Sequence, residues 1–152
     1  MINVNILYGS SCVGKSTIMK KQIDGINKVN CINKVYGINK VEMDDCNYWV
    51  FNKNQWSDIC INFLIENIIN NLHEKDMMFT CGGLPLPDHS IYRQLETEYS
   101  IKFVHKLILV KDIDEYKSYI KKRKRCDIMD SLLEHYKWME STKDLYDEII
   151  WN

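Results

Sequence analysis

The sequence predicts an α/β domain in which a mostly parallel sheet of five strands lies between two layers of helices. Three observations lead to this. Strand-like and helix-like segments alternate along the chain, and that order builds parallel sheets. The length of 152 residues, with 45% hydrophobic and 27% charged residues, suits a single domain over 1–152. The first strand-like segment runs directly into a glycine-rich turn that opens a helix.

Each element follows from its pattern. Apolar residues alternate with Asn over 2–8, which predicts the first strand, and the turn at 9–17 begins a helix that ends near Gly25. Further strands are predicted where short apolar runs end at turn residues: 41–45, 77–81, 103–110 and 148–151. Further helices are predicted where apolar residues recur at helical spacing: 55–73, 88–99, 112–125 and 128–143.

Three copies of one hexad, with the common core Ile-Asn-Lys-Val, occupy about 25–42. Three such short copies cannot form a solenoid core. We interpret them as a tandem duplication that lengthens a surface connection, with a partner-binding hairpin as the alternative.

Composition excludes several classes of protein. Twenty basic and 21 acidic residues give a net charge of −1, which argues against broad electrostatic binding to nucleic acid. No apolar run reaches membrane-spanning length, and the N-terminus lacks a signal region, so we expect no membrane partner. The six cysteines include no Cys-x-x-Cys pair, which favours reduced thiols in a cytoplasmic protein.

One motif is specific. Residues 9–16 fit G-x-x-x-x-G-K-[ST], the Walker A or P-loop pattern. The glycines let backbone N–H groups approach the β- and γ-phosphates of ATP or another nucleoside triphosphate. Lys15 neutralises phosphate charge, and the Ser16 hydroxyl holds Mg²⁺. The predicted nucleotide-binding residues are Gly9, Ser10, Ser11, Cys12, Val13, Gly14, Lys15, Ser16 and Thr17.

With this motif the sequence resembles the small P-loop kinases, the group of nucleoside-monophosphate, shikimate, gluconate and polynucleotide kinases. The segment GSSCVGKST is similar to the loops of guanylate kinases and chloramphenicol phosphotransferases. The resemblance implies a three-layer αβα P-loop fold. It also implies transfer of the γ-phosphate of a Mg-bound nucleotide to a hydroxyl or phosphate of a small molecule or nucleotide.

Asp44 and Asp45 end the strand predicted at 41–45. In the kinases that this chain resembles, an Asp at this place takes the proton of the acceptor hydroxyl, so Asp44 is the candidate base and second metal ligand. Lys15 precedes Asp44 by 29 residues, and without two hexads the spacing is 17, close to that of the family. Polynucleotide kinases carry an Arg where this chain has Asn47. A solvated turn is the alternative.

The acceptor is expected beside the glycine pair that follows the strand at 77–81. Shikimate kinases carry a glycine-rich run there, and gluconate kinases have a Tyr-Arg pair shortly afterwards, as here at 92–93. A tight turn is the alternative. No Asp ends this strand, so the usual Walker B carboxylate is absent. The predicted acceptor residues are Asp45, Trp49, Gly82, Gly83 and Arg93.

A basic run at 121–125 begins a predicted lid over about 121–130. In the resembling kinases, arginines at this place close over ATP, so Arg123 and Arg125 are candidate catalytic residues. A solvated helix end is the alternative.

Relatives in this group continue past the last strand into an adenine-binding loop, whereas this sequence stops at Asn152. The preference for ATP or GTP therefore stays open, and apolar residues at 149–151 allow a homo-oligomer. A catalytically weak or inactive nucleotide-binding regulatory protein is the alternative function. A GTPase switch is disfavoured because the guanine motif Asn-Lys-x-Asp is missing. A nucleic-acid end as acceptor is less favoured than a small molecule or nucleotide.

Overall fold

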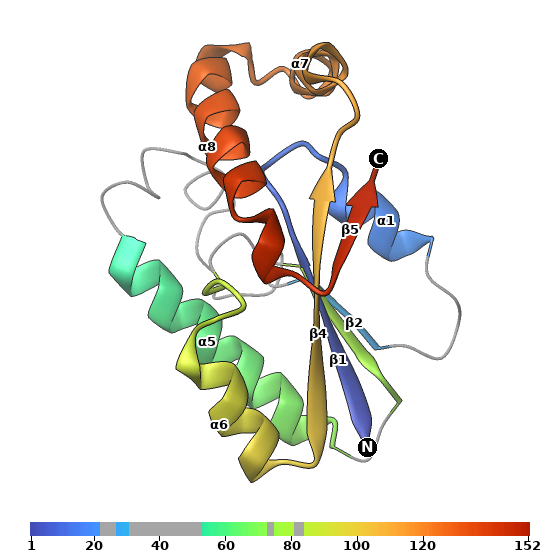
Figure 1. Cartoon of the computed structure of the whole chain (residues 1–152), viewed down its shortest axis with the longest axis vertical. Helices are drawn as coiled ribbons and strands as arrows, with labels where there is room; N and C mark the ends of the chain where they lie inside the picture. Colours follow the sequence, from blue (N-terminus) through green and yellow to red (C-terminus); the bar gives the residue numbers. More distant parts are fainter. Residues whose placement is uncertain (22–26, 31–52, 73–74, 81–83) are drawn as a thin grey trace.

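The computed structural model describes residues 1–21, 27–30, 53–72, 75–80 and 84–152. It confirms an α/β chain with a parallel sheet (Figure 1). The strands lie in the order β2-β3-β1-β4-β5, and every neighbouring pair is parallel. Their bounds are Ile2–Tyr8 (β1), Asn27–Asn30 (β2), Met77–Thr80 (β3), Ile101–Leu109 (β4) and Glu148–Trp151 (β5).

The helices follow the predicted segments closely. They are Lys15–Lys20 (α1), Lys53–Asn70 (α5), Ser90–Glu98 (α6), Ile113–Lys122 (α7) and Met129–Ser141 (α8). Short 3₁₀ turns at Cys126–Ile128 and Lys143–Leu145 precede and follow α8. The first helix is shorter than predicted, because Lys21 caps α1. Among the helices described, none is both long and apolar enough to cross a membrane.

Helices lie on both faces of the sheet, as the three-layer prediction requires. The chain crosses the sheet in one direction from β1 to β2 and in the opposite direction in all later crossovers. Right-handed connections then place α1 on one face and the later helices on the other. Figure 1 shows α5 and α6 on the side of the sheet opposite α1.

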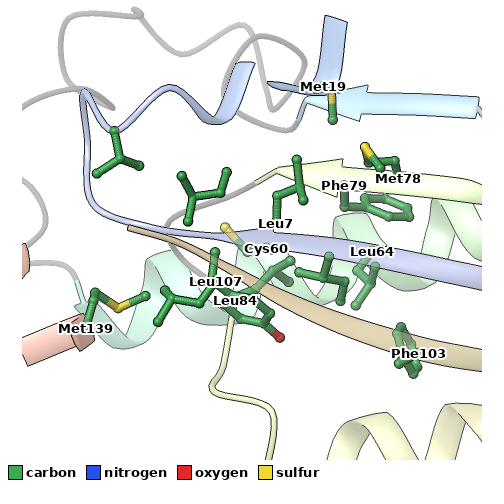
Figure 2. Close-up of a cluster of buried hydrophobic side chains, with 14 of the residues drawn as sticks. Leu7, Met19, Cys60, Leu64, Met78, Phe79, Leu84, Phe103, Leu107 and Met139 are labelled. Carbon is green, nitrogen blue, oxygen red and sulfur yellow. The ribbon is translucent and has the colours of Figure 1, made fainter. Parts of the chain in front are cut away.

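The core is built around β1, which pairs with β3 on one side and β4 on the other. Successive side chains of a strand point to opposite faces, so β1 contributes to both core layers. Figure 2 shows Leu7 and Met19 on one side of the sheet, with Cys60 and Leu64 of α5 on the other. Burial of the Cys60 thiol raises its pKa to about 12, which keeps the thiol protonated.

The second strand differs from the prediction. The sheet position beside β3 is taken by Asn27–Asn30, in the first copy of the hexad, where Asn27 pairs with Met77 and Asn30 with Thr80. The first copy of the repeat therefore contributes a strand to the sheet. The strand predicted at 41–45 lies outside the described residues.

Replacing Ile6 with Ala tests the core. The Ile6 side chain is fully buried in the central strand, so we expect the free energy of unfolding to fall by about 2–5 kcal/mol. Ile69→Ala removes the same atoms from a side chain that is 47% exposed and is the matched control. Chemical denaturation measures both variants, and an equal loss in the two would contradict the placement of Ile6.

Candidate functional site

The glycine-rich loop at 9–17 joins β1 to α1 at the carboxyl end of the central strand. β3 and β4 flank β1, so the loop lies in the middle of the sheet edge where open α/β sheets bind ligands. The C-terminal end of β5 lies at the same end of the sheet (Figure 1). The fold therefore places the one specific motif of the sequence at the expected ligand edge.

The loop backbone has two residues in the left-handed region. Cys12 has φ 70° and Gly14 has φ 101°, whereas φ of the intervening Val13 is not positive. Alternation of this kind turns successive N–H groups toward one concave side and makes an anion cradle. The N–H of Val13 donates to the carbonyl oxygen of Ser10 at 3.4 Å and closes the turn. The glycine was predicted from sequence, but the left-handed Cys12 was not.

The two glycines of the motif are required for different reasons. Gly14 has φ 101°, a conformation that side chains rarely adopt, and a Cβ there would also meet Nδ2 of Asn152. A Cβ on Gly9 would lie 2.7 Å from Cγ2 of Val13 and 3.3 Å from the carbonyl oxygen of Ile108, so the loop packs closely against the end of β4.

Lys15 folds back over the start of its own loop. Its Nζ donates to the carbonyl oxygens of Gly9 and Ser10, the second at 3.3 Å. The ammonium group is therefore held beside the loop rather than extended into solvent. A cation placed there lowers the energy of phosphate oxygens that enter the cradle.

The Ser10 hydroxyl is fully buried, and within the part of the chain that the structure describes it has no hydrogen-bond partner. A buried hydroxyl without a partner costs about 1–3 kcal/mol. A buried polar group without a partner calls for an explanation, and a functional role is one.

Two residues outside the motif donate side-chain hydrogen bonds to backbone carbonyl groups of the loop. The hydroxyl of Tyr116 in α7 donates to the carbonyl oxygen of Ser11 at 2.7 Å. The Nδ2 of Asn152 donates to the carbonyl oxygen of Val13 at 2.7 Å. Sequence reasoning missed both roles, since it assigned residue 116 only to the helix predicted at 112–125. No local pattern could have revealed them, because the contacts join residues 105 and 139 positions apart.

Beneath the loop lies a chain of buried hydrogen bonds. Tyr8, the last residue of β1, donates its hydroxyl hydrogen to Tyr92 at 2.9 Å, and Tyr92 donates to the carbonyl oxygen of Pro85 at 2.7 Å. His105 Nδ1 lies 2.8 Å from the Tyr8 oxygen and must then be the donor, which assigns its tautomer. Burial lowers the pKa of His105 and raises that of Tyr8, so both stay neutral.

Of the predicted acceptor residues, Asp45, Trp49, Gly82 and Gly83 lie outside the described residues, and so does the predicted base Asp44. Arg93 lies in the first turn of α6 and is exposed, and its role in binding the acceptor stays a prediction.

The candidate lid arginines lie at the carboxyl end of α7. Arg123 is exposed and caps the helix, Lys124 has φ 56°, and the N–H of Arg125 donates to the carbonyl oxygen of Ile120 at 3.1 Å. This is a Schellman turn, and its basic side chains also suit the negative end of the helix dipole. Arg123 follows Tyr116 by seven residues, which is about two helical turns. It therefore lies on the same side of α7 as Tyr116, about 10 Å further along the helix axis. Their role as a lid stays a prediction.

The last residue of β3 is Thr80, which carries a hydroxyl. Thr80 is buried and pairs with Leu7 of β1, next to the loop. Among the residues that the structure describes, no group of three or more His, Cys, Asp or Glu could hold a metal ion. Of the two predicted metal ligands, Ser16 lies in the first turn of α1, and Asp44 is outside the described residues.

His135 of α8 is near enough to Lys15 for their charges to interact. Burial, and then the positive charge of Lys15, lower the pKa of His135 from 6.5 to about 4. Its ring stacks on Trp138, with centroids 5.9 Å apart. No pattern in the sequence links His135 to Lys15.

No family model matches the chain, and no curated protein matches it in sequence. The function proposed below is therefore supported by the motif and by the geometry of the loop.

Acid titration tests the position of His135. An unfolded histidine binds its proton near pH 6.5 and the folded one near pH 4, so the unfolded chain binds more protons between these values. The free energy of unfolding should therefore fall as the pH is lowered from 6.5 to 4. In His135→Gln this part of the slope should disappear, while the contribution of His105 remains in both proteins. Denaturation at several pH values measures it, and identical slopes would contradict the burial of His135.

Proposed function

We propose that the chain is an ATP-dependent phosphotransferase of the P-loop type, with a three-layer αβα fold. The observation that carries the proposal is the conformation of the loop. Its left-handed residues at 12 and 14 form a cradle of N–H groups, and the Lys15 ammonium is held beside it. Such a cradle fits the charge and shape of the nucleotide's β- and γ-phosphates.

The donor set also fits Mg²⁺. This ion binds few protein ligands together with phosphate oxygens and water, so one hydroxyl from Ser16 and one carboxylate from Asp44 suffice. Bound there, the ion would neutralise charge on the β- and γ-phosphates.

In the proposed transfer, an oxygen of the acceptor forms a bond to the γ-phosphorus, and the bond from that phosphorus to the β,γ-bridging oxygen breaks. The proton of an acceptor hydroxyl passes to the carboxylate of Asp44, and the nucleoside diphosphate leaves. Lys15 and an arginine at 123 or 125 balance the charge that develops on the transferred group. The acceptor lies among Asp45, Trp49, Gly82, Gly83 and Arg93.

A nucleotide-binding regulatory protein without transfer activity is the second candidate. It is favoured by the hydroxyl of Thr80 at the strand end where kinases and other P-loop enzymes carry an acidic residue. Self-association through the C-terminal region is also a proposal, supported by Trp151, which is 54% exposed on the edge strand β5.

Nucleotide binding is tested with Lys15→Ala. ATP with Mg²⁺ at about 100 times its Kd should stabilise the wild-type chain by about 2.7 kcal/mol, a shift of several degrees in Tm. Lys15→Ala should lose most of this shift, because the cation beside the cradle is gone. Lys20→Ala removes an exposed lysine from the same helix and should keep it. Thermal unfolding with ATP, GTP and ADP measures the effect, and no shift with any nucleotide would overturn the proposal.

The base is tested with Asp44→Asn. A lost general base should lower kcat by about 10²- to 10⁴-fold and leave the affinity for the nucleotide, measured without Mg²⁺, nearly unchanged. Asp58→Asn, at an exposed position of α5, is the matched control. Transfer of labelled γ-phosphate to a panel of hydroxyl and phosphate acceptors supplies the assay. Nucleotide binding without transfer to any acceptor would favour the regulatory protein.

A further inference from the structure

We propose that Tyr116 and Asn152 are positioning residues that aim two N–H donors of the phosphate-binding loop, those of Cys12 and Gly14. The inference rests on the proposed nucleotide site and assigns a role to two residues outside its motif. Its evidence is the pair of hydrogen bonds that these side chains make to loop carbonyl groups, each 2.7 Å long.

The direction of each donor follows from the planarity of the peptide bond. In a trans peptide the carbonyl oxygen and the next N–H point in opposite directions, and none of the described peptides is cis. Tyr116 draws the carbonyl oxygen of Ser11 toward α7, so the N–H of Cys12 points away from α7. Asn152 draws the carbonyl oxygen of Val13 toward the end of β5, so the N–H of Gly14 points away from it. Both donors thus face away from the protein wall that backs the loop.

The same contacts remove a repulsion. A carbonyl oxygen carries partial negative charge and would raise the energy of a phosphate beside it. The carbonyl oxygens of Gly9 and Ser10 accept from Lys15, and those of Ser11 and Val13 accept from the two positioning residues. Each of these four oxygens is therefore paired and turned toward a protein donor before any ligand arrives.

Both side chains are themselves held in place. Tyr116 is fully buried, and its ring lies 4.6 Å from that of Tyr136, whose hydroxyl bonds both backbone groups of Val110. The backbone N–H of Asn152 donates to the carbonyl oxygen of Leu109 at 2.8 Å. A hydrogen-bond donor whose own position is fixed also fixes the loop carbonyl group that accepts from it. A loop held in this way before binding loses little conformational entropy when the ligand binds.

Two substitutions and two matched controls test the inference. Tyr116→Phe removes one hydroxyl from α7, and Tyr119→Phe does the same one turn further on, where the hydroxyl bonds only Glu115 among the contacts described. Asn152→Ala removes one amide, and Asn71→Ala removes an amide that donates to the carbonyl oxygen of Asn67 at 2.7 Å. The probe is inorganic pyrophosphate, which needs the cradle but no base or acceptor.

Two readouts are measured on each protein. The first is the dissociation constant for pyrophosphate, which we expect to rise about fivefold in each positioning variant and to stay within twofold in the controls. The second is the orientation of the Cys12 and Gly14 N–H bonds in the ligand-free protein, from residual dipolar couplings. Tyr116→Phe should change the coupling of Cys12, and Asn152→Ala that of Gly14, with the rest of the sheet unchanged.

The outcomes separate this inference from the proposed function. If the wild type binds pyrophosphate and both variants bind it equally well with unchanged couplings, the positioning role is overturned and the nucleotide site stands. If the wild type binds neither pyrophosphate nor a nucleotide, the proposed function fails, and the couplings alone decide whether the two side chains orient the loop. Equal losses in the controls would show a general loss of stability and would also overturn the inference.

Discussion

The orientation of a few backbone carbonyl groups in the loop at 9–17 is the constraint on which the site depends. A loop can present N–H groups to an anion only if its carbonyl oxygens are turned elsewhere and paired. Here those oxygens are paired with Lys15 of the loop itself, with Tyr116 of α7 and with Asn152 after β5. The positions of β4, α7 and β5 are therefore part of the site, although none of their residues belongs to the motif.

The layer below the loop explains how the loop is kept in register with the sheet. Tyr8 precedes the loop directly, and its hydroxyl is bonded to Tyr92 and His105 within the core. Asp147, which directly precedes β5, is bonded to the same histidine. Its carboxylate accepts from the backbone N–H of His105 at 2.7 Å, and its own backbone N–H donates to the carbonyl oxygen of His105 at 2.8 Å. A buried network with every donor used favours one arrangement of its elements over alternatives. The strand that starts the loop and the strand that ends beside it are thus fixed relative to each other.

Most of the fold could be predicted from local pattern. Strand β1 has the predicted bounds, and the helices and the later strands lie within a few residues of prediction, because their apolar periodicity is strong. The second strand could not be placed, since three hexads share the core Ile-Asn-Lys-Val and local propensity does not distinguish them. Pairing with β3 places the first copy in the sheet, and that is a long-range contact. The C-terminal end of α1 was also missed: the helix ends at Lys20, with Lys21 as its backbone cap, before the predicted end near Gly25.

By itself, the sequence determined the alternation of strands and helices and the place of the P-loop motif between the first strand and the first helix. These depend on residue type and short spacing, which act within a few residues along the chain. Only the tertiary structure decided which side chains hold the loop: Tyr116 and Asn152 reach it from segments more than a hundred residues away, and His135 lies near enough to Lys15 for their charges to interact. Their directions are set by how α7, α8 and β5 pack around the sheet. No local preference in the chain encodes that packing, since it is the combined result of all the buried contacts.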